Sequence, residues 1–239
     1  MHYMHRFGIT EKDAARVAVR DRKHALNNPH AHVRKEISIE DVMRSPMISD
    51  PIKMWDMCPR TDGACAVIFA SEDVAEKINP KPAWVWTTAN RHLYSYLGDV
   101  KTYPIESLER AAKEVYHKTG IKEPLKEIDV MELYLPYSVA GLSWIEGLGL
   151  CGPGQAPKLL WDGVTDMGGE LPINPSGGVI STNPIGATGL IRAAECALQI
   201  SGQAGARQVP DVKVALSTGF GGCFWSDILV YGSKKPNFI

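Results

Sequence analysis

The residues best suited to chemistry lie between positions 174 and 200, where NPSGG is followed by TNPIGATG and then by an apolar repeat. Ile191, Ala194 and Leu198 recur at helical spacing, which predicts a helix with one apolar face. A glycine-rich loop leading into a helix presents free backbone N–H groups and the positive end of the helix dipole, which favour an anion or a developing oxyanion. Such a loop can equally be a turn that uses glycine only for conformation. A nucleotide-phosphate loop is excluded, because neither Gly-Lys-Ser/Thr nor the spaced dinucleotide fingerprint occurs here.

The composition predicts an ordinary globular protein. The chain has 239 residues, a net charge of −1 and 44% hydrophobic residues, enough for one large or two small domains. Near-neutral charge argues against a nucleic-acid partner, and the lack of a long apolar stretch argues against a membrane span. The cysteines form no CxxC pair, which favours a reducing cytoplasm and argues against disulfides and a metal site. They are Cys58, Cys65, Cys151, Cys196 and Cys223.

Strand-like and helix-like segments alternate along the chain, which predicts a layered α/β fold. We expect helices at 10–28, 72–78, 105–119, 138–148 and about 190–200, and strands at 37–39, 83–89, 129–135, 212–216 and 228–231. The apolar run at 64–70 does not alternate, so it predicts a strand buried on both faces. The sequence NPKP at 79–82 is the best linker, and we place the domain boundary there.

A basic segment near the N-terminus allows two interpretations. Its histidines are interleaved with lysine and arginine rather than with metal-binding carboxylates or cysteines, so a solvated basic face is favoured. The alternative is a loop that meets the phosphates of a nucleotide-like ligand. The residues are Arg22, Lys23, His24, His30, His32, Arg34 and Lys35.

Several segments, in this order, resemble the thiolase superfamily, in particular its sterol-carrier-like and archaeal acetyl-CoA acetyltransferase branch. NPSGG with TNPIGATG is similar to the loop before the last long helix of that family. STGFGGCF is similar to the family's final glycine-rich loop. CPRTDGACAVIFAS, YMHRFGIT and NPHAHVRK resemble upstream segments of the same branch.

The resemblance implies a layered αβαβα thiolase fold, of which this chain supplies a part. Residues 1–79 correspond to the end of the N-terminal half, including the remainder of the loop region, and residues 80–239 to the complete C-terminal half. The nucleophilic cysteine of the family is then expected upstream of Met1, so the chain would be a fragment that is inactive alone. Cys65 is interpreted as a small buried hydrophobic residue on a strand.

Three positions depart from the family pattern. Asn183 replaces the histidine of Gly-His-Pro; it can donate a hydrogen bond to an oxyanion but cannot titrate. Gly219 stands where many thiolases have an acid/base cysteine, and Cys223 is either a displaced acid/base or a packed cysteine. Tyr134, in ELYLPYS, either positions substrate or water or is a buried tyrosine with an ordinary partner. The glycines expected to shape the substrate pocket are Gly177, Gly178, Gly186, Gly221 and Gly222.

The implied function is acyl transfer between coenzyme A thioesters, as thiolytic cleavage or condensation of a 3-oxoacyl-CoA by the full-length protein. One alternative is a non-catalytic acyl-CoA or lipid-binding subunit. Another is a thiolase of aromatic 3-oxoacyl-CoA esters, suggested by Trp84, Trp86, Trp144, Trp161 and Trp225. Coenzyme A is expected as a substrate, without a permanently bound cofactor. A homodimer and a small zinc-ribbon and OB-fold partner protein are implied by the resemblance alone.

Overall fold

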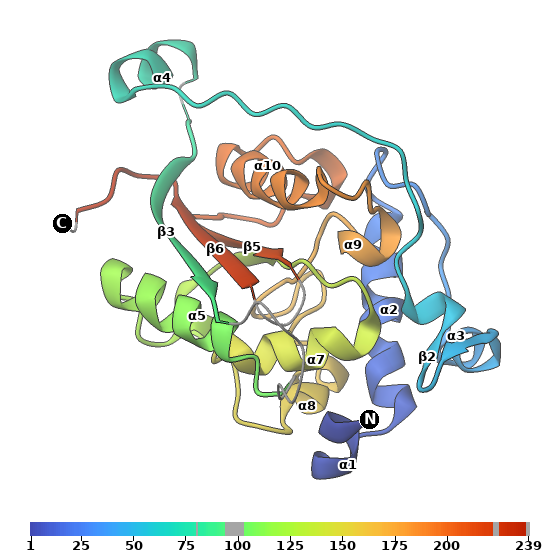
Figure 1. Cartoon of the computed structure of the whole chain (residues 1–239). Coiled ribbons are helices and arrows are strands. Elements are labelled where there is room, and N and C mark those ends of the chain that lie inside the picture. Colours follow the sequence, from blue (N-terminus) through green and yellow to red (C-terminus); the bar gives the residue numbers. More distant parts are fainter. Residues whose placement is uncertain (80, 94–102, 222–224, 238–239) are drawn as a thin grey trace.

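A four-stranded mixed sheet organises the chain (Figure 1). The computed structural model describes residues 1–79, 81–93, 103–221 and 225–237. The strands are β3 (Trp84–His92), β4 (Val130–Glu132), β5 (Val214–Phe220) and β6 (Trp225–Gly232), in the order β3-β6-β5-β4. β6 runs antiparallel to both of its neighbours, and β4 is parallel to β5. Because β4 ends beside β5, the residues that follow both strands meet at one edge of the sheet.

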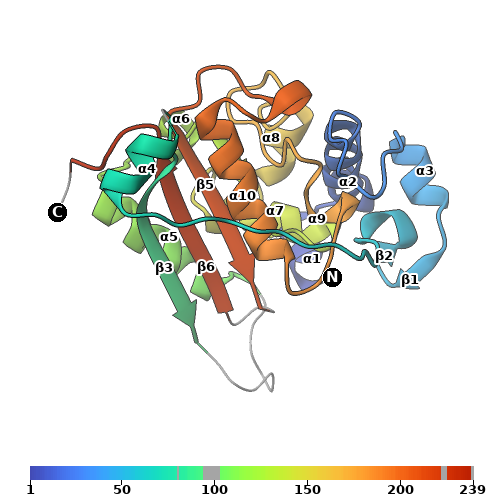
Figure 2. The ribbon, with the colours of Figure 1, turned by 90° about the horizontal axis from the view of Figure 1, so that it is seen from above.

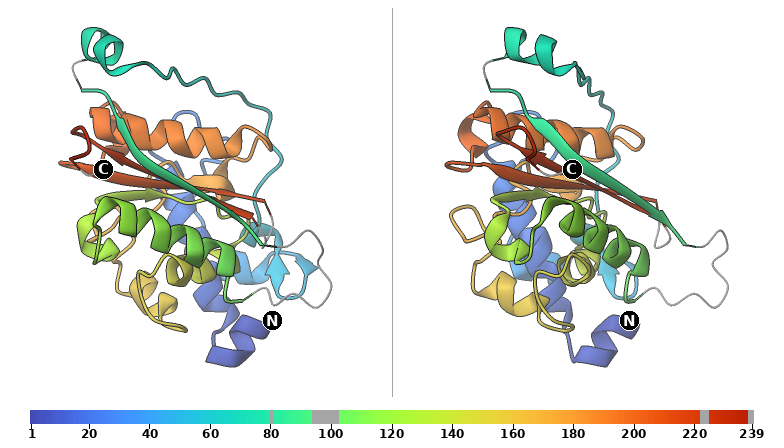
Figure 3. Two further views of the ribbon diagram at one scale, coloured as in Figure 1. Left: turned by 60° about the vertical axis from the view of Figure 1, so that its left-hand side comes forward. Right: turned by 90° about the vertical axis from the view of Figure 1, so that its left-hand side faces the viewer.

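Helices cover both faces of this sheet (Figure 3). α10 (Thr188–Ser201) packs on one face against β4, β5 and β6, and α5 (Glu106–Thr119) packs on the other against β3 and β6. α7 (Ser138–Gly147) contacts α5. The apolar stripe of α5 is buried, as its spacing predicts. The layered α/β fold is therefore confirmed.

The N-terminal segment packs as a helical layer beside the sheet. α1 (His2–Phe7) precedes α2 (Glu11–Ala25), which begins with a capping box between Thr10 and Asp13. α2 contacts α3 (Ile39–Arg44), α7, α8 (Ala156–Trp161) and α9 (Gly178–Ser181). The remaining elements are short: β1 (Met47–Ser49), β2 (Ile52–Lys53), η1 (Met54–Asp56), α4 (Glu72–Ile78), α6 (Pro124–Glu127) and η2 (Gly205–Arg207).

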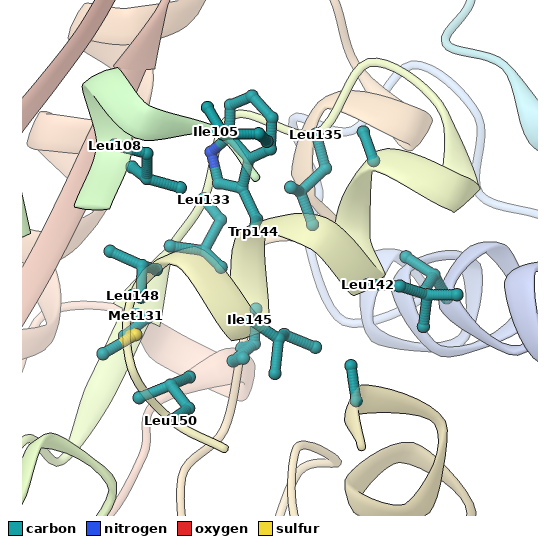
Figure 4. Close-up of a cluster of buried hydrophobic side chains, with 14 of the residues drawn as sticks. Ile105, Leu108, Met131, Leu133, Leu135, Leu142, Trp144, Ile145, Leu148 and Leu150 are labelled. Carbon is teal, nitrogen blue, oxygen red and sulfur yellow. The ribbon is translucent and has the colours of Figure 1, made fainter. Parts of the chain in front are cut away.

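The main hydrophobic core surrounds α7 (Figure 4). Trp144 lies in this core and meets Phe220 at the end of β5 edge-to-face, with ring centroids 4.6 Å apart. Glycines let neighbours approach α7 closely: a Cβ at Gly141 would lie 2.7 Å from Val17 of α2, and one at Gly147 2.9 Å from Leu108 of α5. Helix α2 of the N-terminal segment and helices α5 and α7 therefore share one core. Whether the chain divides at 79/80 stays a prediction.

The prediction of a buried strand at 64–70 is wrong. This segment forms no strand and crosses over α10 to reach α4 (Figure 2). Ile68 and Phe69 are 86% and 71% exposed, and α4 has no buried residue. A doubly buried strand needs a neighbouring strand for its hydrogen bonds, and none of the residues that the structure describes supplies one. Cys65 is accordingly half-buried rather than a core residue.

Smaller corrections concern local structure. Ile37 and Ser38 are irregular instead of extended, with Ser38 capping α3. The strand predicted at 129–135 ends at Glu132, and the loop expected after residue 152 contains α8. In the described part of the chain, every helix is too short or too polar to cross a membrane.

Candidate functional site

Asn183 lies in the loop that leads into α10 and is only 5% exposed. Its backbone N–H donates to Thr61 Oγ1 at 3.1 Å, and its side-chain Nδ2 donates to the Cys58 thiol at 3.1 Å. Its Oδ1 accepts from Thr188 Oγ1 at 2.9 Å. The amide is therefore held at both ends, and its second N–H remains a donor for a ligand.

Tyr134 converges on the same group from the sheet side. Its backbone N–H donates to Thr218 Oγ1 at 2.9 Å, which fixes the chain just after β4 against β5. Its hydroxyl lies near the Thr188 side chain, which lowers the pKa of the phenol, whereas burial raises that pKa by more. The structure thus brings the predicted Tyr134 and Asn183 together through Thr188. Thr188 was not singled out from the sequence, although a threonine at the first position of the helix that follows the Asn183 loop is a usable signal.

Cys58 is a second group that sequence reasoning missed. Burial raises the pKa of this half-buried thiol, while the hydrogen bond from Asn183 and the charge of Arg22 act in the opposite direction. Thr61, three residues later, lies 2.9 Å from His32 Nδ1 and accepts from Asn183. Cys58 and Thr61 of the CPRTDG segment therefore border Asn183, and the resemblance of this segment to the thiolase superfamily was the available signal.

The predicted glycines occupy different surroundings. Gly177 and Gly178, both with positive φ, are buried where α9 packs against α2. Gly186 lies on an exposed turn before α10. Gly221 packs against the Trp225 ring. Gly222 and Cys223 lie outside the described residues, so their roles stay predictions.

A buried polar network anchors the NPSGG loop beneath the site. Glu132 accepts from the backbone N–H of Ser176 at 3.0 Å and from its hydroxyl at 2.8 Å, and it forms an ion pair with Arg192 of α10. Asn174, at φ 54°, accepts from Leu133 N–H at 2.6 Å through its side-chain oxygen. β4, the loop and α10 are thereby joined, because each buried polar group needs a partner.

His24 of α2 supports the same loop from the other side, so it is not part of a solvated basic face. Its Nδ1 lies 3.1 Å from the carbonyl of Asn174, and its Nε2 accepts from Met167 N–H at 3.1 Å. This pattern requires the neutral tautomer with the proton on Nδ1. Burial lowers the pKa of His24, and the charge of Arg20 lowers it further.

Acidification is expected to weaken the fold through His24. Its pKa is lower in the folded than in the unfolded state, so only the unfolded state gains a proton as the pH falls below about 6.5. The free energy of unfolding should therefore drop by on the order of 1 kcal/mol per pH unit there. Urea unfolding at pH 7.5 and 5.5 should show a smaller drop for His24→Gln than for the wild type. The matched control is the exposed His30→Gln, which should keep the full drop; an unchanged slope in His24→Gln would contradict the assignment.

The arrangement can stabilise a negative oxygen but has little capacity for proton transfer near neutral pH. It offers the second N–H of the Asn183 amide as a donor, with the Tyr134 hydroxyl and the Cys58 thiol beside it. Raised thiol and phenol pKa values keep both groups protonated at neutral pH. Within the described residues, no group of three or more His, Cys, Asp or Glu side chains could hold a metal ion.

Comparison with known proteins places this geometry in a family. The profile described as "Thiolase C-terminal domain-like" matches residues 89–232. The chain belongs to the thiolase superfamily. The match covers β4, β5, β6 and the end of β3, and it includes helices α5, α7 and α10.

Three curated relatives each align with 92% of the chain. Sterol carrier protein 2 from Bos taurus is 39% identical, acetyl-CoA acetyltransferase from Methanothermobacter thermautotrophicus 32%, and benzoylsuccinyl-CoA thiolase subunit BbsB from Thauera aromatica 35%. The chain spans 41%, 57% and 58% of their respective lengths. Among solved structures, an Ltp2-ChsH2(DUF35) aldolase superposes with a TM-score of 0.84 at 28% identity, covering 97% of this chain and 60% of that one.

Proposed function

We propose that the full-length protein transfers acyl groups between coenzyme A thioesters, by thiolytic cleavage or condensation of a 3-oxoacyl-CoA. The observation that carries this proposal is the convergence of Asn183 and Tyr134 on Thr188 at the start of α10. Acyl transfer develops negative charge on a carbonyl oxygen, and buried, fixed donors stabilise that charge most strongly. The acetyltransferase and thiolase names of two relatives support the same reaction class.

In this proposal the attacking thiolate comes from a cysteine outside these 239 residues. Asn183 donates its second amide N–H to the carbonyl oxygen as the tetrahedral intermediate forms. Tyr134, beside Thr188, positions the substrate oxygen or a water molecule. Since neither side chain titrates near neutral pH, a separate group has to carry the proton, and Cys223 remains the candidate from this chain.

The test is an assay of the full-length protein with acetoacetyl-CoA and free coenzyme A, following loss of the 3-oxoacyl thioester. Formation of two acyl-CoA products that depends on coenzyme A supports acyl transfer. An aromatic 3-oxoacyl-CoA in parallel tests the aromatic sub-class suggested by the BbsB relative. A protein that binds acyl-CoA without turning over either ester would contradict acyl transfer.

A second candidate is cleavage of a carbon–carbon bond in a 3-hydroxyacyl-CoA by a retro-aldol reaction. The similarity to the Ltp2-ChsH2(DUF35) aldolase favours it, as does the replacement of a titratable histidine by Asn183. In that reaction the Asn183 amide would stabilise the thioester enolate instead of a tetrahedral oxyanion. Release of an aldehyde from a 3-hydroxyacyl-CoA, without added coenzyme A, distinguishes it from thiolysis.

A non-catalytic carrier is the third candidate function, supported by the carrier name of the bovine relative.

We also propose a cytoplasmic homodimer and a small zinc-ribbon and OB-fold partner. The similarity to the Ltp2-ChsH2(DUF35) aldolase supports such a partner. Size-exclusion chromatography with and without the candidate partner tests both assemblies.

A further inference from the structure

Arg22 of α2 is a buried cation that forms no hydrogen bond with the residues that the structure describes. The residue is only 2% exposed, and its Nε and Nη1 atoms are buried without a hydrogen bond to any described residue. The sequence placed Arg22 on a solvated basic face, and that interpretation is wrong. Burial lowers the pKa of its guanidinium to about 10, which still leaves it charged at neutral pH. A buried charge in this condition is costly unless something pairs with it.

The adjacent carboxylate does not supply the missing partner. Asp21 Oδ1 accepts from Arg20 Nε at 2.9 Å and from Arg20 Nη2 at 2.8 Å. Asp21 Oδ2 accepts from Asn174 Nδ2 at 2.9 Å. Both oxygens are therefore engaged by other groups. Among the ion pairs of residues that the structure describes, none includes Arg22.

An aromatic ring contacts Arg22 but cannot replace an anion. The Arg22 guanidinium carbon lies 5.2 Å from the Trp55 ring centroid, and Lys35 Nζ lies 5.2 Å from the same centroid. A cation–π contact offsets only part of the cost of removing a guanidinium from water. Two cations on one indole also leave the local charge positive.

Arg22 borders the candidate site through Cys58. Cys58 follows Trp55 by three residues and accepts from the Asn183 amide at 3.1 Å. The charge of Arg22 lowers the pKa of the Cys58 thiol, against the larger effect of burial. α2 lies beside α9 and the segment that leads into Asn183 (Figure 1). The unpaired guanidinium thus lies in the neighbourhood of the proposed oxyanion donor.

We infer that Arg22 is a specificity residue that binds a carboxylate carried by the acyl group of the substrate. This inference rests on the proposed acyl-CoA site. A planar guanidinium pairs with a carboxylate through two parallel hydrogen bonds, which matches the free Nε edge of Arg22. The phosphates of coenzyme A are a less suitable source of the anion, because the pantetheine arm separates them from the thioester carbonyl that Asn183 would contact.

The test measures binding of glutaryl-CoA and pentanoyl-CoA to the full-length protein by calorimetry. The two acyl chains have equal length and differ in one terminal carboxylate, and neither carries a 3-oxo group. Wild type is expected to bind glutaryl-CoA roughly 10-fold to 100-fold more tightly, the range of a hydrogen-bonded charged group. Arg22→Met should abolish this preference, and Arg22→Lys should retain part of it. Lys35→Met, which removes the second cation on Trp55, should keep it.

Equal affinity of wild type for the two thioesters overturns the inference; a carboxylate from elsewhere in the full-length protein that pairs with Arg22 would give this result. Weakened binding of free coenzyme A by Arg22→Met, without a change in the glutaryl preference, would assign the guanidinium to a phosphate and also overturns it. If Arg22→Met does not fold, Arg22→Lys decides, because a glutaryl preference equal to that of the wild type would show that the geometry of the guanidinium is not used. Binding preference is independent of turnover, so failure of the proposed acyl transfer would leave this result readable.

Discussion

Replacing Asn183 with alanine is expected to lower the turnover number of the full-length protein by roughly 10²-fold to 10³-fold, as for other oxyanion donors. The Asn183 amide is fixed by Thr188 on one side and Cys58 on the other, so its free N–H is directed before substrate arrives. Its loss removes an interaction that strengthens as the carbonyl becomes an oxyanion. Affinity for coenzyme A should change little, because the amide acts on the acyl carbonyl.

Two matched variants sharpen this prediction. Asn183→His restores the side chain typical of the family; it should keep more activity than Asn183→Ala and should give the rate a new dependence on pH near neutrality. Tyr134→Phe removes only the hydroxyl near Thr188, and it should have a smaller effect than Asn183→Ala. The measurement is steady-state turnover with acetoacetyl-CoA. Retention of wild-type turnover by Asn183→Ala would exclude Asn183 as the oxyanion donor.

Replacing Gly177 with alanine is expected to reduce the free energy of unfolding by about 3 kcal/mol or more, from overpacking and left-handed strain together. Gly177 has φ 89°, where an L side chain is strained. An added Cβ would lie 2.4 Å from the Ala25 Cβ and 2.7 Å from its Cα. Because Ala25 belongs to α2, the helix cannot move aside without disturbing the shared core. Urea unfolding followed by circular dichroism measures the loss.

Gly186→Ala is the matched control for this change. Gly186 has φ 94°, similar to Gly177, but an added Cβ would meet nothing within 4 Å. Only the left-handed strain applies, so the expected loss is about 1–2 kcal/mol. A Gly177→Ala protein as stable as Gly186→Ala would show that α9 and α2 do not pack as closely as described.

This pair of glycines also shows what motif recognition leaves open. Both belong to glycine-rich motifs that resemble a thiolase pocket, and their residue type alone gives them the same role. The structure separates them: Gly177 is required by the contact of α9 with α2, and Gly186 forms an exposed turn. A glycine in a motif therefore indicates a special backbone conformation before it indicates contact with a ligand.

The sequence by itself determined the family, the layered α/β fold and the two groups that meet at Thr188. Ordered motifs and local periodicity carry that information, because α5 and α10 have apolar stripes and Asn183 belongs to the glycine-rich loop that leads into α10. Only the tertiary structure decided which distant side chains share the site. Cys58 reaches Asn183 across 125 positions, and nothing local predicts that contact.

Arg22 looked like a surface cation because its neighbours in sequence are charged, whereas the packing of α2 against η1 buries it. The strand expected at 64–70 failed for the same reason: apolar residues favour a buried strand, but strand pairing is a property of neighbouring chain segments, and the described residues supply no pairing strand there.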